Sequence, residues 1–88
     1  MHYEFDLAKD ESNFTKHGLR LSDAAYFDWE TALILEDRRQ AYAEPRYEAK
    51  GYVEERLCVM VFCLRASAVR VISLRKANLR EVKSYAEA

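Results

Sequence analysis

The apolar and polar positions at the start of the chain predict a short strand followed by a helix. Residues 2–5 alternate as a strand does. Asp6 has a side chain that caps helix N-termini, and Gly18 stands where a helix end needs a left-handed backbone. We therefore expect a helix between these two residues, with Leu7 and Phe14 on its buried stripe.

A second, shorter helix is predicted directly after the first. Ser22 is its expected N-cap, and Asp23 places a negative charge in the first turn, where the helix dipole favours one. The side chains expected to pack inward from this segment are Ala24, Ala25, Phe27 and Trp29.

The pattern then changes to that of strands. Across residues 46–54, Arg46, Glu48 and Lys50 alternate with apolar or small residues, which predicts one wet and one buried face. Residues 57–64 are almost continuously apolar, as in a central strand covered on both faces. Two further strands are predicted over 31–37 and 69–76, with a loop over 38–45.

The chain is predicted to end in a helix. Asn78 can cap it, and Glu81 three residues later completes a capping box. Its apolar stripe is expected to contain Leu79, Val82 and Tyr85. Because short turns join the successive strands, we expect an antiparallel β-sheet meander. Two N-terminal helices and one C-terminal helix would flank this sheet, giving an α+β two-layer domain.

Length and composition restrict the class of protein. A chain of 88 residues is expected to form one domain over residues 1–88, because two cores of half this size would each be too small to be stable. The hydrophobic share of 50% excludes a disordered chain. No apolar run is long enough for a membrane span, and the acidic start is unlike a signal peptide.

The two cysteines indicate the redox environment. Cys58 and Cys63 are five residues apart on one predicted strand, so they face opposite sides and lie too far apart for a disulfide. We expect buried, reduced thiols in a cytoplasmic protein. No Cys or His spacing is typical of a metal site, and no cofactor is expected.

The net charge of −1 conceals an asymmetry between the two halves. Residues 1–44 hold five Lys or Arg against ten Asp or Glu, whereas residues 45–88 hold nine against five. Six of the basic residues lie between Arg65 and Lys83, with Glu81 the one acid among them. Such a basic segment is typical either of an anionic partner or of ordinary solvated strands.

Three ordered blocks of residues carry a resemblance to a known family. The first contains Phe5-Asp6, Lys9, Asn13, Lys16-His17-Gly18, Ala24 and Ala25. The second contains Glu36-Asp37-Arg38, Tyr42, Glu44, Arg46 and Gly51. The third contains Arg70-Val71-Ile72-Ser73, Arg75, Ala77, Glu81 and Tyr85. In this order, and over almost the whole chain, they resemble the BrnT family of bacterial toxins.

The resemblance implies a ribonuclease toxin of a type II toxin–antitoxin pair with a RelE-like fold. It implies a BrnA-like antitoxin that contains a ribbon-helix-helix DNA-binding region. Promoter DNA would be bound only through the complex, which could assemble as a heterotetramer. The substrate implied is RNA, and cleavage would inhibit translation and growth.

Cleavage of RNA without a metal needs a base for the 2′-hydroxyl proton, cations for the phosphate and an acid for the leaving oxygen. The 2′-hydroxyl also distinguishes RNA from DNA. The residues that we single out for catalysis are Arg46, Arg75, Glu44 and Arg38. Those singled out for RNA binding are Lys50, Arg70, Lys76, Tyr42, Tyr52 and His17.

Several of these residues have a structural alternative. Strict alternation puts Arg75 on one face of the last strand with Ser73, and Arg70 on the other, where it could pair with Glu81. Glu44 could act as a base only with a raised pKa and is more often a solvated loop carboxylate.

Two further candidates have equally plain alternatives. Arg38 could simply pair with Asp37 in the loop. His17 could stabilise the end of its helix through the dipole rather than touch RNA. A non-catalytic RNA- or protein-binding module also stays open, because the chain has no unambiguous nucleophile or His/Glu pair.

Overall fold

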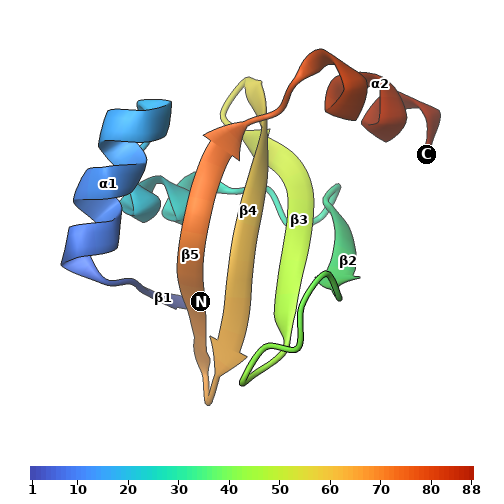
Figure 1. The fold of residues 1–88 in the computed structure, drawn as a ribbon. Coiled ribbons are helices and arrows are strands. Elements are labelled where there is room, and N and C mark those ends of the chain that lie inside the picture. The colour runs from blue at the N-terminus through green and yellow to red at the C-terminus, as the bar shows by residue number, and fades with distance from the viewer.

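The computed structural model describes the whole chain, Met1–Ala88, as one sheet with three short helices (Figure 1). The strands are β1 (His2–Glu4), β2 (Leu33–Asp37), β3 (Arg46–Val53), β4 (Arg56–Arg65) and β5 (Ala68–Lys76). The helices are α1 (Leu7–His17), the 3-10 helix η1 (Leu21–Tyr26) and α2 (Leu79–Glu87). No helix is both long and apolar enough to cross a membrane.

The sheet is mixed, so the predicted antiparallel meander is wrong. The strand order is β1-β5-β4-β3-β2, and β1 pairs in parallel with β5 while the other pairs are antiparallel. Short turns do make β3, β4 and β5 a meander. Short turns predict only the pairing of strands that follow each other in the chain. They do not predict the pairing of β1 with β5, because two helices and three strands lie between them. The α+β class itself is correct.

Of the two predicted N-terminal helices, only the first is an α-helix. Asp6 caps α1 by accepting from the backbone N–H groups of Ala8 and Lys9, and Gly18 ends it at φ 73°. The second segment is a single 3-10 element. It begins one residue before the predicted cap Ser22, and the Asp23 carboxylate accepts from the backbone N–H of Arg20.

The main core lies between η1 and one face of the sheet, which is the rear face in Figure 1. Leu21 and Ala24 of η1 are fully buried there, and Phe27 follows at 6% exposure. Phe27 packs so closely on Gly51 of β3 that a Cβ there would lie 2.5 Å from its ring. Trp29, which was predicted to pack inward, is half-buried at the rim of this core. Its indole N–H donates to the Tyr3 hydroxyl.

Helix α1 is held by polar contacts, so the predicted apolar stripe is wrong. Leu7 is 77% exposed and Phe14 is 44% exposed. The one buried residue of α1 is Asn13. Its amide accepts from the backbone N–H of Leu74 at 3.1 Å and donates to the carbonyls of Leu74 and Leu19, each at 2.8 Å. Asn13 thus pairs with the free edge of β5 as another strand would.

A β-bulge in β5 changes which of its side chains share a face. Val61 of β4 pairs with Ser73 and Phe62 pairs with Val71, so Ile72 is the extra residue. The predicted separation of Arg70 from Arg75 is therefore wrong. Both arginines lie on the same face as Ser73, because one inserted residue reverses the alternation between them.

Helix α2 does not cover the apolar face of the sheet as predicted. The capping box is confirmed, with Asn78 and Glu81 each accepting the other's backbone N–H. However, Leu79 is 88% exposed and Val82 is 42% exposed. Tyr85 alone packs on the sheet, beside a small cluster on the face opposite η1. The helix projects from the end of β5 (Figure 1).

Both cysteines are free and buried, as predicted. They face opposite sides of β4, because Cys58 belongs to the main core whereas Cys63 lies on the other face, next to Glu44.

Candidate functional site

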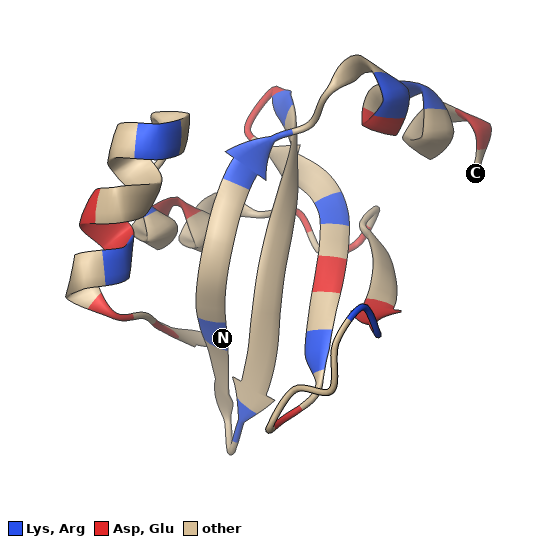
Figure 2. Ribbon diagram, viewed as in Figure 1, with Lys and Arg blue, Asp and Glu red and all other residues tan.

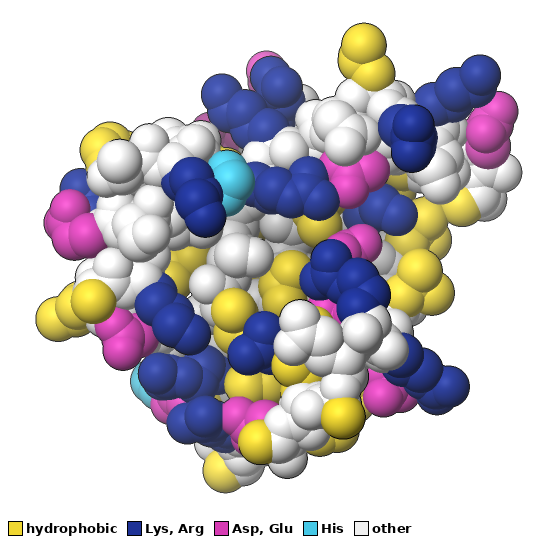
Figure 3. All heavy atoms as spheres, in the orientation of Figure 1, with side chains coloured by type: hydrophobic (Ala, Val, Ile, Leu, Met, Phe, Trp, Pro, Cys, Tyr) yellow, Lys and Arg dark blue, Asp and Glu magenta, His cyan; other side chains and the backbone are white.

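The sheet face turned away from η1 carries a concentration of charged side chains. On β3 these are Arg46, Glu48 and Lys50, which give the alternating bands of Figure 2. On β5 they are Arg70 and Arg75. We call this surface, together with Ser73 between the two arginines, the open face. In Figure 3, Lys and Arg side chains surround a hollow in which apolar atoms are visible.

The floor of the open face is apolar, and Tyr85 of α2 packs against the end of it that contains Val59. Val59, Val61 and Cys63 of β4 supply this floor, and Val59 has no exposed surface at all. The long charged side chains of the neighbouring strands flank the rest of the floor. Because apolar surroundings screen charges less than water does, electrostatic effects between these groups are strengthened.

The strand register places two cationic side chains in one row of the sheet and a carboxylate in the next row. Lys50 and Arg75 flank Val59, and Glu48 lies in the next row, opposite Val61 and in line with Ser73. A phosphate over this floor would meet cations from two different strands and a carboxylate between them.

Arg75 is held in place by Glu81 of α2. Two hydrogen bonds of 2.7 and 2.8 Å join its guanidinium to the two carboxylate oxygens. This pairing, with a weaker contribution from Glu48, raises the pKa of Arg75, and it lowers the pKa of Glu81 to about 2. The partner of Glu81 is therefore Arg75, and the alternative pairing of Arg70 with Glu81 is wrong.

Glu48 is the carboxylate of the open face that has no partner. It makes neither an ion pair nor a hydrogen bond within the chain, and it is half-buried. The charge of Glu48 helps to raise the pKa of Arg75. It also helps to raise the pKa of Arg39, for which Asp37 is the largest cause. A half-buried carboxylate that makes no hydrogen bond within the chain keeps its acceptor oxygens open to a hydroxyl group of a ligand.

Arg46 and the loop after β2 form the side of the open face nearest β2. The Arg46 guanidinium lies 4.3 Å from the centre of the Tyr42 ring. The Tyr42 hydroxyl donates to Asp37, which also accepts two side-chain hydrogen bonds from Arg39. These bonds hold the pKa of Asp37 well below its usual range. Tyr42 thus supports Arg46 with one face of its ring.

Glu44 is unsuited to the role of base. Arg65 donates two hydrogen bonds to its Oε1, at 3.0 and 2.8 Å, and the Cys63 thiol donates a third. These donors lower the pKa of Glu44, whereas a base would need a raised one. Arg70 lies close to this pair and is 3.6 Å from Glu4.

Two predicted residues lie away from the open face. Arg38 pairs with Glu36 instead of Asp37, at 3.3 Å, and its side chain is 80% exposed. Lys76 pairs in register with Cys58, so it points to the face that η1 covers. Tyr52 is on the open face but at the end beside α2, where its ring contacts the edge of Tyr85.

His17 lies at the end of α1, beside the β5 edge. Burial lowers its pKa first, and the charges of Lys16 and Arg75 lower it further. His17 lines a small pocket together with Ser73 of β5, so it lies beside the open face. No group of three or more His, Cys, Asp or Glu side chains is arranged to hold a metal ion.

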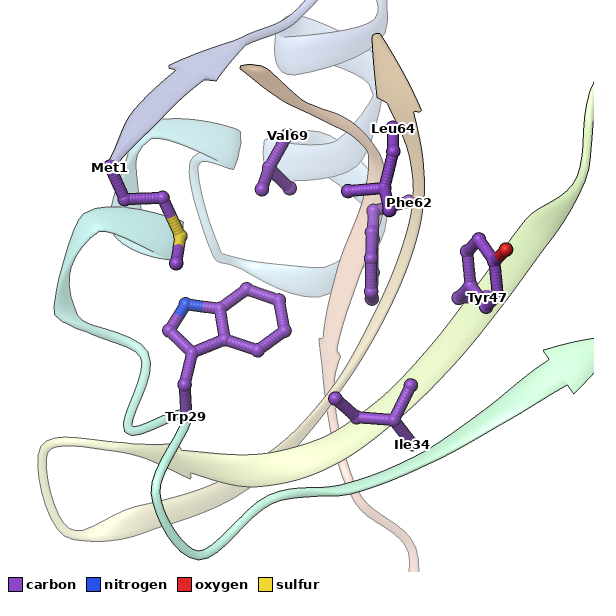
Figure 4. Close-up of a pocket in the computed structure, with 7 residues that line it drawn as sticks. All are labelled: Met1, Trp29, Ile34, Tyr47, Phe62, Leu64 and Val69. Carbon is purple, nitrogen blue, oxygen red and sulfur yellow. The ribbon is translucent and has the colours of Figure 1, made fainter. Parts of the chain in front are cut away.

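A separate apolar groove of about 330 Å³ opens on the opposite side of the sheet (Figure 4). Trp29 and Ile34 line it on one side, and Phe62, Leu64 and Val69 line it on the other. Exposed apolar surface of this kind is typical of protein contacts. No Lys, Arg, His, Asp or Glu is among the residues that line the groove.

Sequence reasoning missed Glu48 as a site residue and Arg39 as the partner of Asp37. The signal for Glu48 was present, because strict alternation placed it between Arg46 and Lys50 on the wet face. No such signal existed for Arg39, since loop residues follow no period and the choice between Arg38 and Arg39 depends on how the loop folds.

Comparisons with known proteins agree with the resemblance seen in the residues. The family model described as "Ribonuclease toxin, BrnT, of type II toxin-antitoxin system" matches residues 5–81. No curated protein matches the chain. The matched span includes every residue of the open face.

Proposed function

Since the chain belongs to the BrnT family of ribonuclease toxins of type II toxin–antitoxin systems, we propose that its open face is the site of RNA cleavage. The observation that carries this proposal is Glu48, an unpaired carboxylate between cations of two strands. The apolar groove on the other side of the sheet is lined by no Lys, Arg, His, Asp or Glu side chain.

In the proposed reaction, the carboxylate of Glu48 takes the proton from a 2′-hydroxyl. The 2′-oxygen forms a bond to the adjacent phosphorus, and the bond from phosphorus to the 5′-oxygen breaks. The products are a 2′,3′-cyclic phosphate and a 5′-hydroxyl, whose proton comes from water. Every step uses the RNA's own 2′-hydroxyl, so DNA is not a substrate.

Lys50, Arg46 and Arg75 stabilise the negative charge that builds on the phosphate oxygens. Arginine is suited to this role because its planar fork matches two phosphate oxygens and keeps its charge. Arg75 is preorganised by Glu81, and Arg46 by the Tyr42 ring. With base and cations both supplied by side chains, the proposed cleavage is independent of metal ions.

The test is the Glu48→Gln variant, which removes the base but preserves size. We expect kcat for RNA cleavage to fall by about 10²–10⁴-fold, because this is the usual contribution of a positioned general base. KM should change little, since Glu48 is not proposed to bind the phosphate. Cleavage of a fluorophore-labelled RNA in excess chelator measures both constants.

The matched control is Glu55→Gln in the exposed turn between β3 and β4, which removes the same charge away from the site. It should retain wild-type kcat. If Glu48→Gln cleaves as fast as this control, Glu48 is not the base and the proposed mechanism is wrong. Loss of all cleavage on adding the chelator would contradict metal independence.

We also propose the partner of this toxin, because type II systems contain a protein antitoxin. The proposed partner is BrnA-like, with a ribbon-helix-helix region that gives the complex its promoter contacts, in an assembly that can be a heterotetramer. It neutralises the toxin by covering the open face. Copurification with the product of the adjacent gene checks this, and recovery of no such protein would contradict it.

A further inference from the structure

A small polar pocket lies between α1 and β5, outside the row of groups proposed for catalysis. Its volume is about 130 Å³. From α1 it is lined by Lys9, Ser12, Asn13, Lys16 and His17, and from β5 by Ile72 and Ser73. Asn13 is already engaged with Leu74 and Leu19, so the free polar groups are the lysines, the hydroxyls and the imidazole.

The pocket contains donors and no acid. Lys9 and Lys16 are seven residues apart and Ser12 lies between them, which places all three on one face of α1. Neither lysine nor His17 takes part in an ion pair, although the chain has more acids than bases. Two ammonium groups with hydroxyls between them fit a phosphate, which has strong acceptors and negative charge.

The pocket is continuous with the open face through the β5 bulge. Ile72, the inserted residue, lines the pocket, and Ser73 belongs both to the pocket and to the row that contains Glu48. The charged groups that face His17 are Lys16 on its own helix and Arg75 on β5, and both are cations. Any anion that lies over Arg75 therefore has a neighbouring binding position ready for a second anion.

We propose that this pocket is a phosphate subsite, which binds a backbone phosphate of the RNA strand next to the one that is cleaved. The inference rests on the proposed function, because it assumes that the cleaved phosphate lies on the open face. The pocket determines which way the strand runs across the protein, from β3 over β5 to α1. It contributes binding energy without touching the reacting atoms.

The first experiment uses inorganic phosphate alone and follows the imidazole signals of His17 by NMR. In the wild-type protein we expect saturable shifts and a rise in the pKa of His17, because a bound anion favours the imidazolium form. The Lys9→Ala/Lys16→Ala double variant should lose them. The Arg80→Ala/Lys83→Ala variant removes the same charge from exposed positions of α2 and should keep them.

The second experiment measures binding of an RNA that lacks the 2′-hydroxyl at the cleaved position. The Lys9→Ala/Lys16→Ala variant should bind about tenfold more weakly than the Arg80→Ala/Lys83→Ala control. The slope of log K against log salt should become shallower by about 0.7 for each phosphate that the variant no longer neutralises. Circular dichroism of both double variants checks that α1 and α2 remain folded.

The outcomes separate the two proposals. An absence of saturable His17 shifts in the wild type would overturn the subsite. Phosphate binding with unchanged RNA affinity in the Lys9→Ala/Lys16→Ala variant would show a site for free phosphate and overturn its role in RNA binding. If both measurements support the subsite while Glu48→Gln cleaves normally, the catalytic assignment fails and the subsite stands.

Discussion

At the scale of single residues, polar side chains define this structure as much as apolar ones do. Asn13 is the clearest example, because a buried amide on α1 replaces the strand that the edge of β5 would otherwise need. Sequence reasoning found Asn13 only as part of the family resemblance. A buried Asn has no periodic signature, since its role depends on the two backbone groups it meets.

We predict that Asn13→Ala is strongly destabilising. The variant leaves the N–H and carbonyl groups of Leu74 buried without partners, which should lower the free energy of unfolding by about 3 kcal/mol. Urea denaturation followed by circular dichroism measures this. Thr15→Ala, on the exposed side of the same helix, is the control and should change stability by less than about 0.5 kcal/mol. Equal stability of both variants would mean that the Asn13 amide contributes nothing to holding α1.

At the scale of elements, α2 is joined to the sheet mainly through one ion pair and one tyrosine. Arg75 and Glu81 form the ion pair, while the Tyr85 hydroxyl donates to the carbonyl of Thr31. The capping box predicted where the helix starts, because the cap is local. The apolar stripe of α2 predicted that Leu79 and Val82 are buried, but they are exposed. Burial of a helix face requires another part of the chain to pack against it, and a local pattern does not indicate whether one does.

The Arg75–Glu81 ion pair makes part of the stability depend on pH. Because the pKa of Glu81 is lowered from 4.5 to about 2, its contribution is complete above pH 4.5 and is lost as the pH falls through 2. Urea midpoints measured over this range should fall less steeply for Glu81→Gln than for the wild type. The Gln side chain can still accept the Asn78 N–H, so the cap is retained.

Glu55→Gln, which removes a carboxylate without a partner, serves as the control for this measurement. Its stability should follow the wild-type dependence on pH. If Glu81→Gln and Glu55→Gln give the same slope between pH 4.5 and 2, the ion pair does not contribute to the acid-side loss of stability.

At the scale of the whole molecule, the position of charge matters more than its sum. The net charge is −1, yet the open face collects cations from β3, β5 and the loop after β2. The sequence indicated a basic C-terminal segment. It did not indicate that Arg70 and Arg75 share a face, because the bulge at Ile72 is a property of the pairing between strands.

Two charge reversals test this view. Arg46→Glu and Arg56→Glu each replace a positive by a negative charge, so each takes the net charge from −1 to −3. Arg46 lies on the open face, whereas Arg56 is the exposed first residue of β4. We expect RNA affinity to fall at least about tenfold for Arg46→Glu and by less than about twofold for Arg56→Glu. Fluorescence anisotropy with uncleavable RNA measures both, and equal losses would assign binding to net charge alone.

The sequence by itself determined the family, the α+β class, the bounds of most elements and both helix caps, because each depends on neighbours within a few residues. Only the tertiary structure decided the parallel β1, the shared face of Arg70 and Arg75, and the exposed stripe of α2. It likewise revealed Glu48 as a carboxylate without a partner. These features depend on contacts between segments that are far apart in the chain, and a local sequence pattern does not indicate which segments will be in contact.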